Sequence, residues 1–286
     1  MEDRGFLQHG SVQMEQSGSY VAEEMPGGFD RELARLRQQA LLSWDKEIMA
    51  LRRLGLTDGM AVLDVGGGPG FVTEQLLAAL PASGVTMIDR DPALIAQARG
   101  YLQPGAGDRL AIVEASVMDS GLPDDSFDFA LARLVFQHLP DPVGAAREIR
   151  RVLKPGGRLV VADIDDKLQL YDPPNEPEID AIFSRLDADQ EDKGGSRFIG
   201  RRLPRILREA GFVDLQLESV LLHSDIMGMG PLADDPDPEF WQGMVDAGSI
   251  TAAERDTILA AIERFNGSDP IILLTILMAA GQKAAR

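Results

Sequence analysis

Apolar positions along the chain follow two different spacings, and each spacing predicts a different kind of element. From Asp30 to Leu51, apolar residues recur at every third or fourth position, which is typical of one face of a helix. Further on, short continuous apolar runs alternate with segments of helical spacing. The runs predict strands at residues 60–65, 84–89, 109–115, 126–133 and 155–165. Two of the intervening helices begin with Asp-Pro, at Asp91 and Asp141, a common helix start.

This alternation predicts an α/β fold. Strands that are apolar on both faces and are separated by helices form parallel sheets covered on both sides. Because crossover connections are right-handed, we expect an open, doubly wound sheet. A ligand of such a sheet lies at the carboxyl ends of the strands, near the point where the strand order reverses.

The pattern changes after residue 165. A helix at about residues 200–210 and strands at residues 213–223 and 271–280 continue the fold, but two polar inserts interrupt it, at about residues 166–198 and 224–269. We predict that the inserts form a lid. Residues 1–28 are rich in Gly, Ser and Glu, and we expect a mobile arm there, followed by one domain over residues 29–286.

Charge and cysteine content narrow the possible functions. Asp and Glu outnumber Lys and Arg by 46 to 28, so the net charge is −18, which disfavours nucleic acid as a partner. The absence of cysteine excludes disulfides and cysteine-based metal sites, and we predict no bound metal. No signal-peptide core and no run long enough to insert into a membrane are present, so we expect a cytoplasmic protein. A homo-oligomer remains possible.

The stretch "VLDVGGGPGF" at residues 62–71 carries the first candidate chemistry. A glycine turn between a strand and a helix places backbone N–H groups at the helix start and lets a ligand approach closely. Asp64, before the turn, can hold an ammonium group. Asp89, at the end of the second predicted strand, can accept two hydrogen bonds from a ribose diol.

Three glycine-turn templates can be compared with this stretch. A phosphate-binding P-loop needs Lys-Ser or Lys-Thr after the glycines, but Phe71 and Val72 follow. The dinucleotide pattern G-x-G-x-x-G fails because its sixth position is Phe71 or Thr73. The pattern acid-x-G-x-G-x-G fits at every position. Its four members are Asp64, Gly66, Gly68 and Gly70.

That pattern resembles motif I of class I S-adenosylmethionine-dependent methyltransferases. The resemblance continues through residues 84–99, 122–142, 146–161 and 203–217, and it covers about residues 30–222 and the final strand. The UbiE-like small-molecule branch is the most similar. The resemblance implies a Rossmann-like, mostly parallel sheet of seven strands in the order 3-2-1-4-5-7-6. It also implies S-adenosyl-L-methionine as the cofactor, a small-molecule acceptor and a biosynthetic methyl transfer.

The resemblance also implies roles for single residues. The backbone from Gly66 to Gly70 would face the methionine part of the cofactor, Asp64 would steer its ammonium through water, and Asp89 would hold the ribose. The other implied cofactor residues are Arg90, Ser116 and Val117 beside the adenine, the carbonyls of Arg133 and Leu134 for the ammonium, and Tyr20 and Gln39 near the amino terminus. Relatives usually carry Asp at the position of Ser116. Either Ser116 replaces it weakly, or Asp119 takes its role.

Methyl transfer from a sulfonium depends chiefly on positioning, and a base is needed only if the nucleophile must lose a proton. His138 is the candidate base, and a structural hydrogen bond is the alternative. Asp163 and Asp165 end the fifth predicted strand, where they either approach the substrate or bond loop backbone. The segment of residues 171–177, which contains Asp-Pro-Pro, we interpret as a stiff part of the lid.

The inserts carry aromatic and methionine side chains that suit a partly hydrophobic acceptor, or that simply pack helices. They are Phe183, Phe240, Trp241, Met227, Met229 and Met244. A nicotinamide-dependent oxidoreductase is disfavoured because the dinucleotide pattern fails. A non-methylating member of the same fold, such as a cyclase or a regulatory module, remains open, as do the acceptor and the attacked atom.

Overall fold

A mixed sheet forms the frame of the molecule in the computed structural model, which describes residues 19–229, 232 and 237–285. In the described residues its strand order is β3-β2-β1-β4-β5-β8-β6, and β7 pairs with the other edge of β8. The strands are β1 (Ala61–Val65), β2 (Gly84–Asp89), β3 (Leu110–Glu114), β4 (Phe127–Arg133), β5 (Leu153–Ile164), β6 (Leu170–Asp172), β7 (Val213–His223) and β8 (Ile271–Gln282).

The predicted topology is confirmed. The first five strands are parallel to one another, and β8 runs antiparallel to β5 and to β7. The strand order of the seven expected strands therefore holds. The additional strand β6 is short and pairs with the start of β8, at residues 271–273. The order reverses between β1 and β4, which places a ligand site at the carboxyl ends of these strands.

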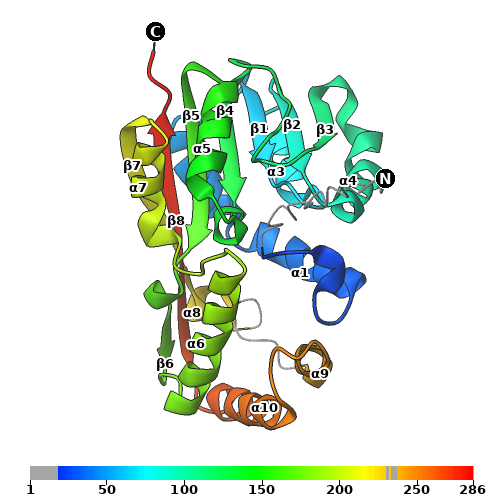
Figure 1. Cartoon of the computed structure of the whole chain (residues 1–286), viewed down its shortest axis with the longest axis vertical. Helices are drawn as coiled ribbons and strands as arrows, with labels where there is room; N and C mark the ends of the chain where they lie inside the picture. The colour runs from blue at the N-terminus through cyan, green and yellow to red at the C-terminus, as the bar shows by residue number, and fades with distance from the viewer. Residues whose placement is uncertain (1–18, 230–231, 233–236, 286) are drawn as a thin grey trace, which may run out of the picture.

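Helices cover both faces of the sheet (Figure 1). The main helices are α1 (Phe29–Leu42), α2 (Trp44–Arg53), α3 (Phe71–Ala79), α4 (Pro92–Ala106), α5 (Pro142–Val152), α6 (Pro177–Asp192), α7 (Leu203–Glu209), α8 (Ser224–Met227), α9 (Pro238–Asp246) and α10 (Ala252–Asn266). α2, α3 and α4 pack on one face, and α5 and α7 on the other. None of the helices in the described part of the chain is long and apolar enough to cross a membrane.

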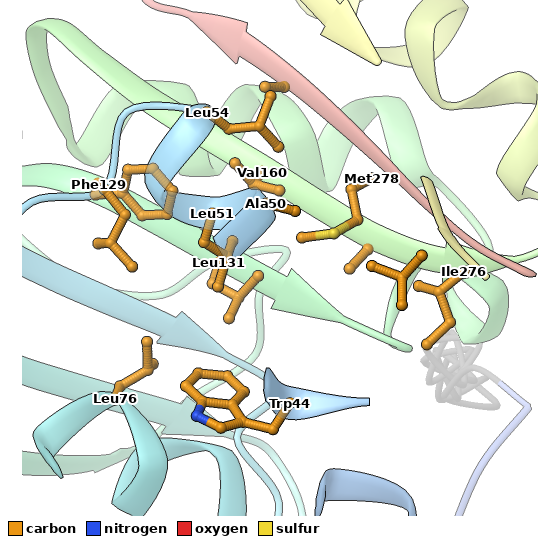
Figure 2. Close-up of a cluster of buried hydrophobic side chains, with 14 of the residues drawn as sticks. Trp44, Ala50, Leu51, Leu54, Leu76, Phe129, Leu131, Val160, Ile276 and Met278 are labelled. Atoms are coloured by element: carbon orange, nitrogen blue, oxygen red, sulfur yellow. The ribbon is translucent and has the colours of Figure 1, made fainter. Parts of the chain in front are cut away.

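One of the two main cores lies under α2 and α3. Figure 2 shows Trp44 and Leu51 of α2 in one cluster with Phe129 and Leu131 of β4, and Leu51 and Phe129 are fully buried. Burial of side chains of this size stabilises a fold by about 1.5–3 kcal/mol each. This core fixes the strands whose carboxyl ends carry the candidate site.

The single helix expected from Asp30 to Leu51 is two helices. Ser43 separates α1 from α2 and has a non-helical backbone, with φ −120° and ψ 2°. The break lets α2 turn its apolar side toward the sheet, while Arg31 near the start of α1 contacts Asp237 and Phe240 of the second insert. The apolar spacing in the sequence cannot reveal this change of direction, because apolar residues recur at every third or fourth position in both helices.

The second half of the chain adds a small helical insert. α6, α9 and α10 gather at the lower end of Figure 1, away from the parallel strands. They share an apolar cluster of their own, in which Ile179, Trp241 and Ile258 are buried. The predicted lid inserts therefore contain a packed core of their own.

The start of the described chain is packed rather than free. Residues 22–24 form a short 3-10 helix, and Ala22 is fully buried. The backbone N–H of Ser19 donates to the carbonyl of His138 at 3.1 Å. Residues 19–28 of the expected mobile arm therefore belong to the ordered fold, and residues 1–18 lie outside the described residues.

Candidate active site

A cavity of about 500 Å³ lies at the carboxyl ends of β1, β2 and β4, and residues of α1, α3 and the segment before α1 close it. This volume is within the range of small-molecule and cofactor sites. Most of the residues that the sequence singled out lie on its wall. They are Tyr20, Gln39, Gly66, Gly68, Asp89, Arg90, Val117, Arg133, Leu134 and His138. Asp64, Gly70 and Ser116 are not among the wall residues.

The glycine turn after β1 presents bare backbone to the cavity. Gly66 and Gly68 have φ of +66° and +56°, which favour glycine. The N–H groups of Gly66 and Gly67 both donate to the carbonyl of Ile88, at 2.8 and 3.1 Å. These two N–H groups are therefore paired within the protein, and the contact of the turn with the methionine part of a cofactor stays a prediction. The glycines let a ligand in the cavity approach the backbone of the turn closely.

Gly70 has a different reason to be glycine. Its φ is +89°, and an added Cβ would lie 2.5 Å from Cδ1 of Leu102 on α4. It lies behind the turn, where the missing side chain lets α3 and α4 pack closely. Glycine at this last position of the acid-x-G-x-G-x-G pattern is thus required by helix packing, and Gly70 does not line the cavity.

Asp89 joins the turn to the cavity wall. Its Oδ2 accepts the N–H of Gly68 at 2.8 Å, and its Oδ1 accepts the N–H of Asp91 at 2.9 Å. Burial raises the pKa of the Asp89 carboxyl, and these two N–H groups oppose the rise. Each carboxylate oxygen can accept more than one hydrogen bond, so both retain capacity for ligand hydroxyls.

Asp64 lies beneath the turn instead of on the wall. It is 2% exposed, and its Oδ2 accepts a hydrogen bond of 2.6 Å from the hydroxyl of Thr73. Burial raises its pKa to about 6. A Cβ added to Gly67 would lie 3.1 Å from Oδ2, so Asp64 sits against the inner side of the turn. Its direct structural role is to tie β1 to the start of α3.

Arg133, at the end of β4, turns its side chain into the protein. Its guanidinium forms two bonds with the fully buried carboxylate of Glu47 on α2, at 2.7 and 2.9 Å, and a third with the carbonyl of Gln39 at 2.9 Å. Removing one partner of such a buried pair lowers the stability of a fold far more than removing one partner of a surface pair does. The next residue, Leu134, has φ +58°, and its N–H donates to the carbonyl of Ala162.

The wall beside the end of β3 is apolar. Val117 lines the cavity, but Ser116 does not, and its hydroxyl accepts the N–H of Met118 at 3.2 Å. Asp119 is exposed, does not line the cavity, and forms an isolated β-bridge with Ser116. Neither of the two residues considered for the missing family acid therefore reaches the cavity.

The segment before α1 crosses the mouth of the cavity. The guanidinium of Arg90 donates to the carbonyl of Tyr20 at 3.0 Å, and the hydroxyl of Tyr20 donates to the buried carboxylate of Glu32 at 2.6 Å. The guanidinium of Arg35 donates two hydrogen bonds to the same carboxylate, at 2.7 and 2.8 Å. Burial and the neighbouring Glu32 raise the pKa of Tyr20, so its hydroxyl stays protonated. These contacts fasten the segment to both β2 and α1.

His138 lies in a 3-10 turn after β4, with its ring centroid 5.2 Å from that of Tyr20. Its Nδ1 and the Ser19 hydroxyl are 3.0 Å apart. Burial, together with the guanidinium groups of Arg197, Arg35 and Arg90, lowers the pKa of His138 to about 4. The imidazole is therefore neutral at neutral pH, which allows it to exchange hydrogen bonds but makes it a weak proton acceptor.

The two acids at the end of β5 hold loops. Asp163 is fully buried and accepts the N–H groups of Gln137 at 3.1 Å and Ile164 at 2.9 Å. Burial raises its pKa to about 7. Asp165 is also fully buried and pairs with the guanidinium of Arg201. Neither lines the cavity, so both match the expected alternative of bonding loop groups.

The sequence reasoning missed two wall residues, Gln190 and Arg197. Both line the cavity, and the side-chain amide of Gln190 donates to the carbonyl of Gln137 at 3.2 Å. They come from the first insert, and no local motif marks them. Arg35 also lines the cavity, and it belongs with Tyr20, Glu32 and Gln39 to a spacing that resembles bacterial members of the UbiE-like branch.

The aromatic and methionine side chains proposed for the acceptor pocket are mostly core residues. Phe240 alone of the six lines the cavity. Trp241, Phe183 and Met244 belong to the core of the insert, and Met227 and Met229 pack on the main core. Of the two alternatives for this group, helix packing therefore describes five of the six, and Phe240 is the one that faces the large cavity.

These features together define a class of protein. A parallel sheet with its cavity at the strand-order switch, a glycine turn after β1 and a carboxylate after β2 is the arrangement of α/β proteins that bind nucleoside-containing cofactors. Within the described residues, no group of three or more His, Asp or Glu side chains is arranged to hold a metal ion.

Comparison with known proteins identifies a domain. Residues 63–161 match the family model described as a methyltransferase domain. Over this segment the chain is similar to the class I S-adenosylmethionine-dependent methyltransferases. The matched segment contains the glycine turn, Asp89 and His138, and it ends within β5.

Two relatives are similar to this chain over part of their length. An uncharacterized 37.1 kDa protein in a transposon of Streptomyces fradiae is 37% identical over 172 residues, which are 58% of this chain and 47% of the relative. The ubiquinone/menaquinone biosynthesis C-methyltransferase UbiE of Paracoccus denitrificans is 30% identical over 163 residues, which are 57% of this chain and 60% of the relative. The chain thus spans about half the length of these curated relatives.

A solved structure supports the fold over most of the chain. Phosphoethanolamine N-methyltransferase 2 of Haemonchus contortus, in complex with S-adenosyl-L-methionine, aligns with a TM-score of 0.52 at 16% identity. The alignment covers 96% of this chain and 58% of that chain. At this identity the likeness concerns the fold alone.

Proposed function

We propose that the protein transfers the methyl group of S-adenosylmethionine to a small organic acceptor bound in the 500 Å³ cavity. The observation that carries this proposal is the pairing of the bare glycine turn with the Asp89 carboxylate on one cavity wall. The residues fit the cofactor, because the turn admits close contact and Asp89 keeps acceptor capacity for a ribose diol.

The cofactor would lie along β1, β2 and β4. In this placement Asp89 receives the ribose hydroxyls, Gly66 and Gly68 contact the methionine part, and Val117 contacts the adenine. The remaining proposed contacts are Arg90 beside the adenine, the carbonyls of Arg133 and Leu134 at the ammonium, and Tyr20 and Gln39 over the site. Asp64 and Gly70 would support the turn from behind, and Ser116 would shape the loop after β3. When bound, S-adenosylmethionine supplies an electrophilic methyl group on a sulfonium.

The acceptor would occupy the other half of the cavity. Polar groups of His138, Gln190 and Arg197 line that half together with the apolar side chains of Ile164 and Phe240. A mixed wall of this kind suits a small molecule with a polar end and an apolar body. The net charge of −18 makes a nucleic acid a poor acceptor.

Positioning is the main contribution that this chain makes to the reaction. The wall holds a nucleophile in line with the methyl group, and such alignment supplies much of the acceleration of a displacement. We propose that His138 contacts the acceptor and orients it by a hydrogen bond. With a pKa of about 4, its proton acceptance is not expected to shape the rate between pH about 6 and about 8.

Two measurements test the function. Calorimetry with S-adenosylhomocysteine is expected to show one saturable site per chain, and a nicotinamide nucleotide is expected not to bind. Incubation with methyl-labelled S-adenosylmethionine and a panel of small quinols, phenols, amines and unsaturated lipids is then expected to label a small-molecule product. Failure of S-adenosylhomocysteine to bind would overturn the cofactor assignment. Binding without transfer to any class of acceptor would favour the non-methylating alternative.

A further inference from the structure

A second cavity, of about 180 Å³, lies within the helical insert. Its walls come from α6 and α10, from β6 and β8, and from the loop of residues 173–176. In Figure 1 this region is at the lower end of the molecule, where α6 and α10 lie beside the start of β8. The methyl-transfer proposal gives this cavity no role.

The wall of this cavity is dominated by apolar side chains. It includes Ile179, Phe183, Ile258, Ile262, Phe265 and Ile272. Of these, Ile179, Ile258 and Ile272 are buried, so they form a fixed inner surface rather than a solvent-facing one.

The wall also contains polar residues, Tyr171, Asn175, Glu176, Arg264 and Asn266, of which several are paired. Glu176 and Arg264 form a two-bond pair there, at 2.8 and 3.0 Å, and the hydroxyl of Tyr171 is 3.4 Å from the side chain of Gln169. Among the described residues, the one buried side-chain atom without a hydrogen-bond partner is Nε of Arg150, which does not line this cavity. The inner wall therefore offers no unpaired buried group that would select a polar or charged ligand.

We propose that this cavity is a binding site for a small, uncharged apolar molecule about the size of a single aromatic ring. Its volume is slightly larger than the roughly 150 Å³ of an engineered apolar cavity that binds benzene or xenon, although this cavity is partly open to solvent. An apolar occupant would gain dispersion contacts with the lining side chains and would remove their apolar surface from water.

The occupant of this site is separate from the cofactor and the acceptor. No residue lines both cavities. α6 contributes to both, with Phe183 on one wall and Gln190 on the other, and seven residues of helix separate them by about 10 Å. The two sites are therefore expected to fill independently, and this inference stands whether or not the protein transfers methyl groups.

Xenon and toluene are the probes for the experiment. In crystals of the full chain under xenon pressure, we expect a xenon peak between α6 and α10. In solution, toluene is expected to shift the methyl NMR signals of Ile179, Ile258, Ile262 and Ile272 in a saturable way. Saturating S-adenosylhomocysteine is expected to leave the toluene affinity unchanged within twofold, since the cofactor occupies the other cavity.

A filled-cavity variant provides the decisive comparison. Ala261 lines the cavity, so Ala261→Leu is expected to weaken toluene binding at least tenfold. If Ala261→Leu does not fold, Ala261→Val takes its place and is expected to weaken toluene binding by a smaller factor. Ala253→Leu makes the same change at an exposed position of the same helix and should not alter binding. Absence of both xenon density and saturable methyl shifts in the parent chain would overturn the proposal. Equal toluene affinity in the parent and a folded Ala261 variant, or displacement by S-adenosylhomocysteine, would do the same.

Discussion

Replacing Asp89 with alanine tests the cofactor half of the large cavity most directly. The carboxylate stands on the cavity wall at the end of β2 and is anchored by the N–H groups of Gly68 and Asp91. Asp89→Ala removes the acceptor proposed for the ribose diol and leaves the neighbouring backbone in place. The variant should therefore bind S-adenosylhomocysteine more weakly.

The size of the loss follows from the hydrogen bonds involved. A hydrogen bond to a charged group contributes about 1.5–3 kcal/mol net, and the ribose offers two hydroxyls. Water entering the space left by the carboxylate would satisfy part of this demand. We expect a total loss of about 1–3 kcal/mol, which corresponds to a dissociation constant about 5- to 150-fold higher. The fold should also lose stability, because the N–H of Gly68 loses its partner.

Calorimetry with S-adenosylhomocysteine measures this loss, and urea unfolding shows what fraction of the variant is folded at the assay temperature. Glu114→Ala is the matched control. Glu114 pairs in register with Asp89 on the neighbouring strand, is exposed, and does not line the cavity. Glu114→Ala should bind as the parent does. A folded Asp89→Ala protein whose dissociation constant stays within twofold of the parent's would refute the ribose assignment.

Three further predictions concern the frame of the site. Glu47→Gln leaves the guanidinium of Arg133 buried without its anion and should lower the free energy of unfolding in urea by about 3–5 kcal/mol, whereas a loss below about 1 kcal/mol would contradict a buried pair. Gly70→Ala, at φ +89°, should cost about 1–3 kcal/mol, while Gly100→Ala, in open space on α4, should stabilise by about 0.5–1 kcal/mol; equal effects would be inconsistent with this account. The pKa of Asp163 is raised to about 7 in the folded chain, so its contribution to stability is present in acid and is lost as the pH rises from about 4 to about 7. Asp163→Asn should therefore show a smaller fall in unfolding free energy between pH about 5 and about 8, and an unchanged slope would rule this out.

The order of strands and helices could be predicted from the sequence because it depends on local periodicity. A strand alternates its side chains and a helix repeats every 3.6 residues, whatever lies elsewhere in the chain. The glycine spacing from Gly66 to Gly70 is equally local, since positive φ is open to glycine without steric cost. Asp89 could be placed because the end of a parallel strand next to the switch point has a fixed position in this fold.

Long-range pairing decided what the sequence could not. Arg133 and Glu47 are 86 positions apart, and Ser19 and His138 are 119 apart, so no motif joins them. The contact of Ser19 with His138 ties the segment before α1 to the loop after β4. The low pKa of His138 likewise depends on burial and on arginines that are distant in the sequence, Arg197 first among them. The apolar side chains of the insert are chemically alike, but some pack in its core and others line the cavity. Trp241 is buried in the core, whereas its neighbour Phe240 lines the cavity.

The sequence by itself thus determined the sheet, the turn and the acid that point to an adenosyl cofactor. Only the tertiary structure decided which of these groups remain available to a ligand. Availability depends on whether a partner elsewhere in the chain has already taken the hydrogen bond, as Thr73 does for Asp64 and Ile88 does for Gly66. A buried polar group accepts whichever partner the fold brings near, because leaving it unpaired is costly.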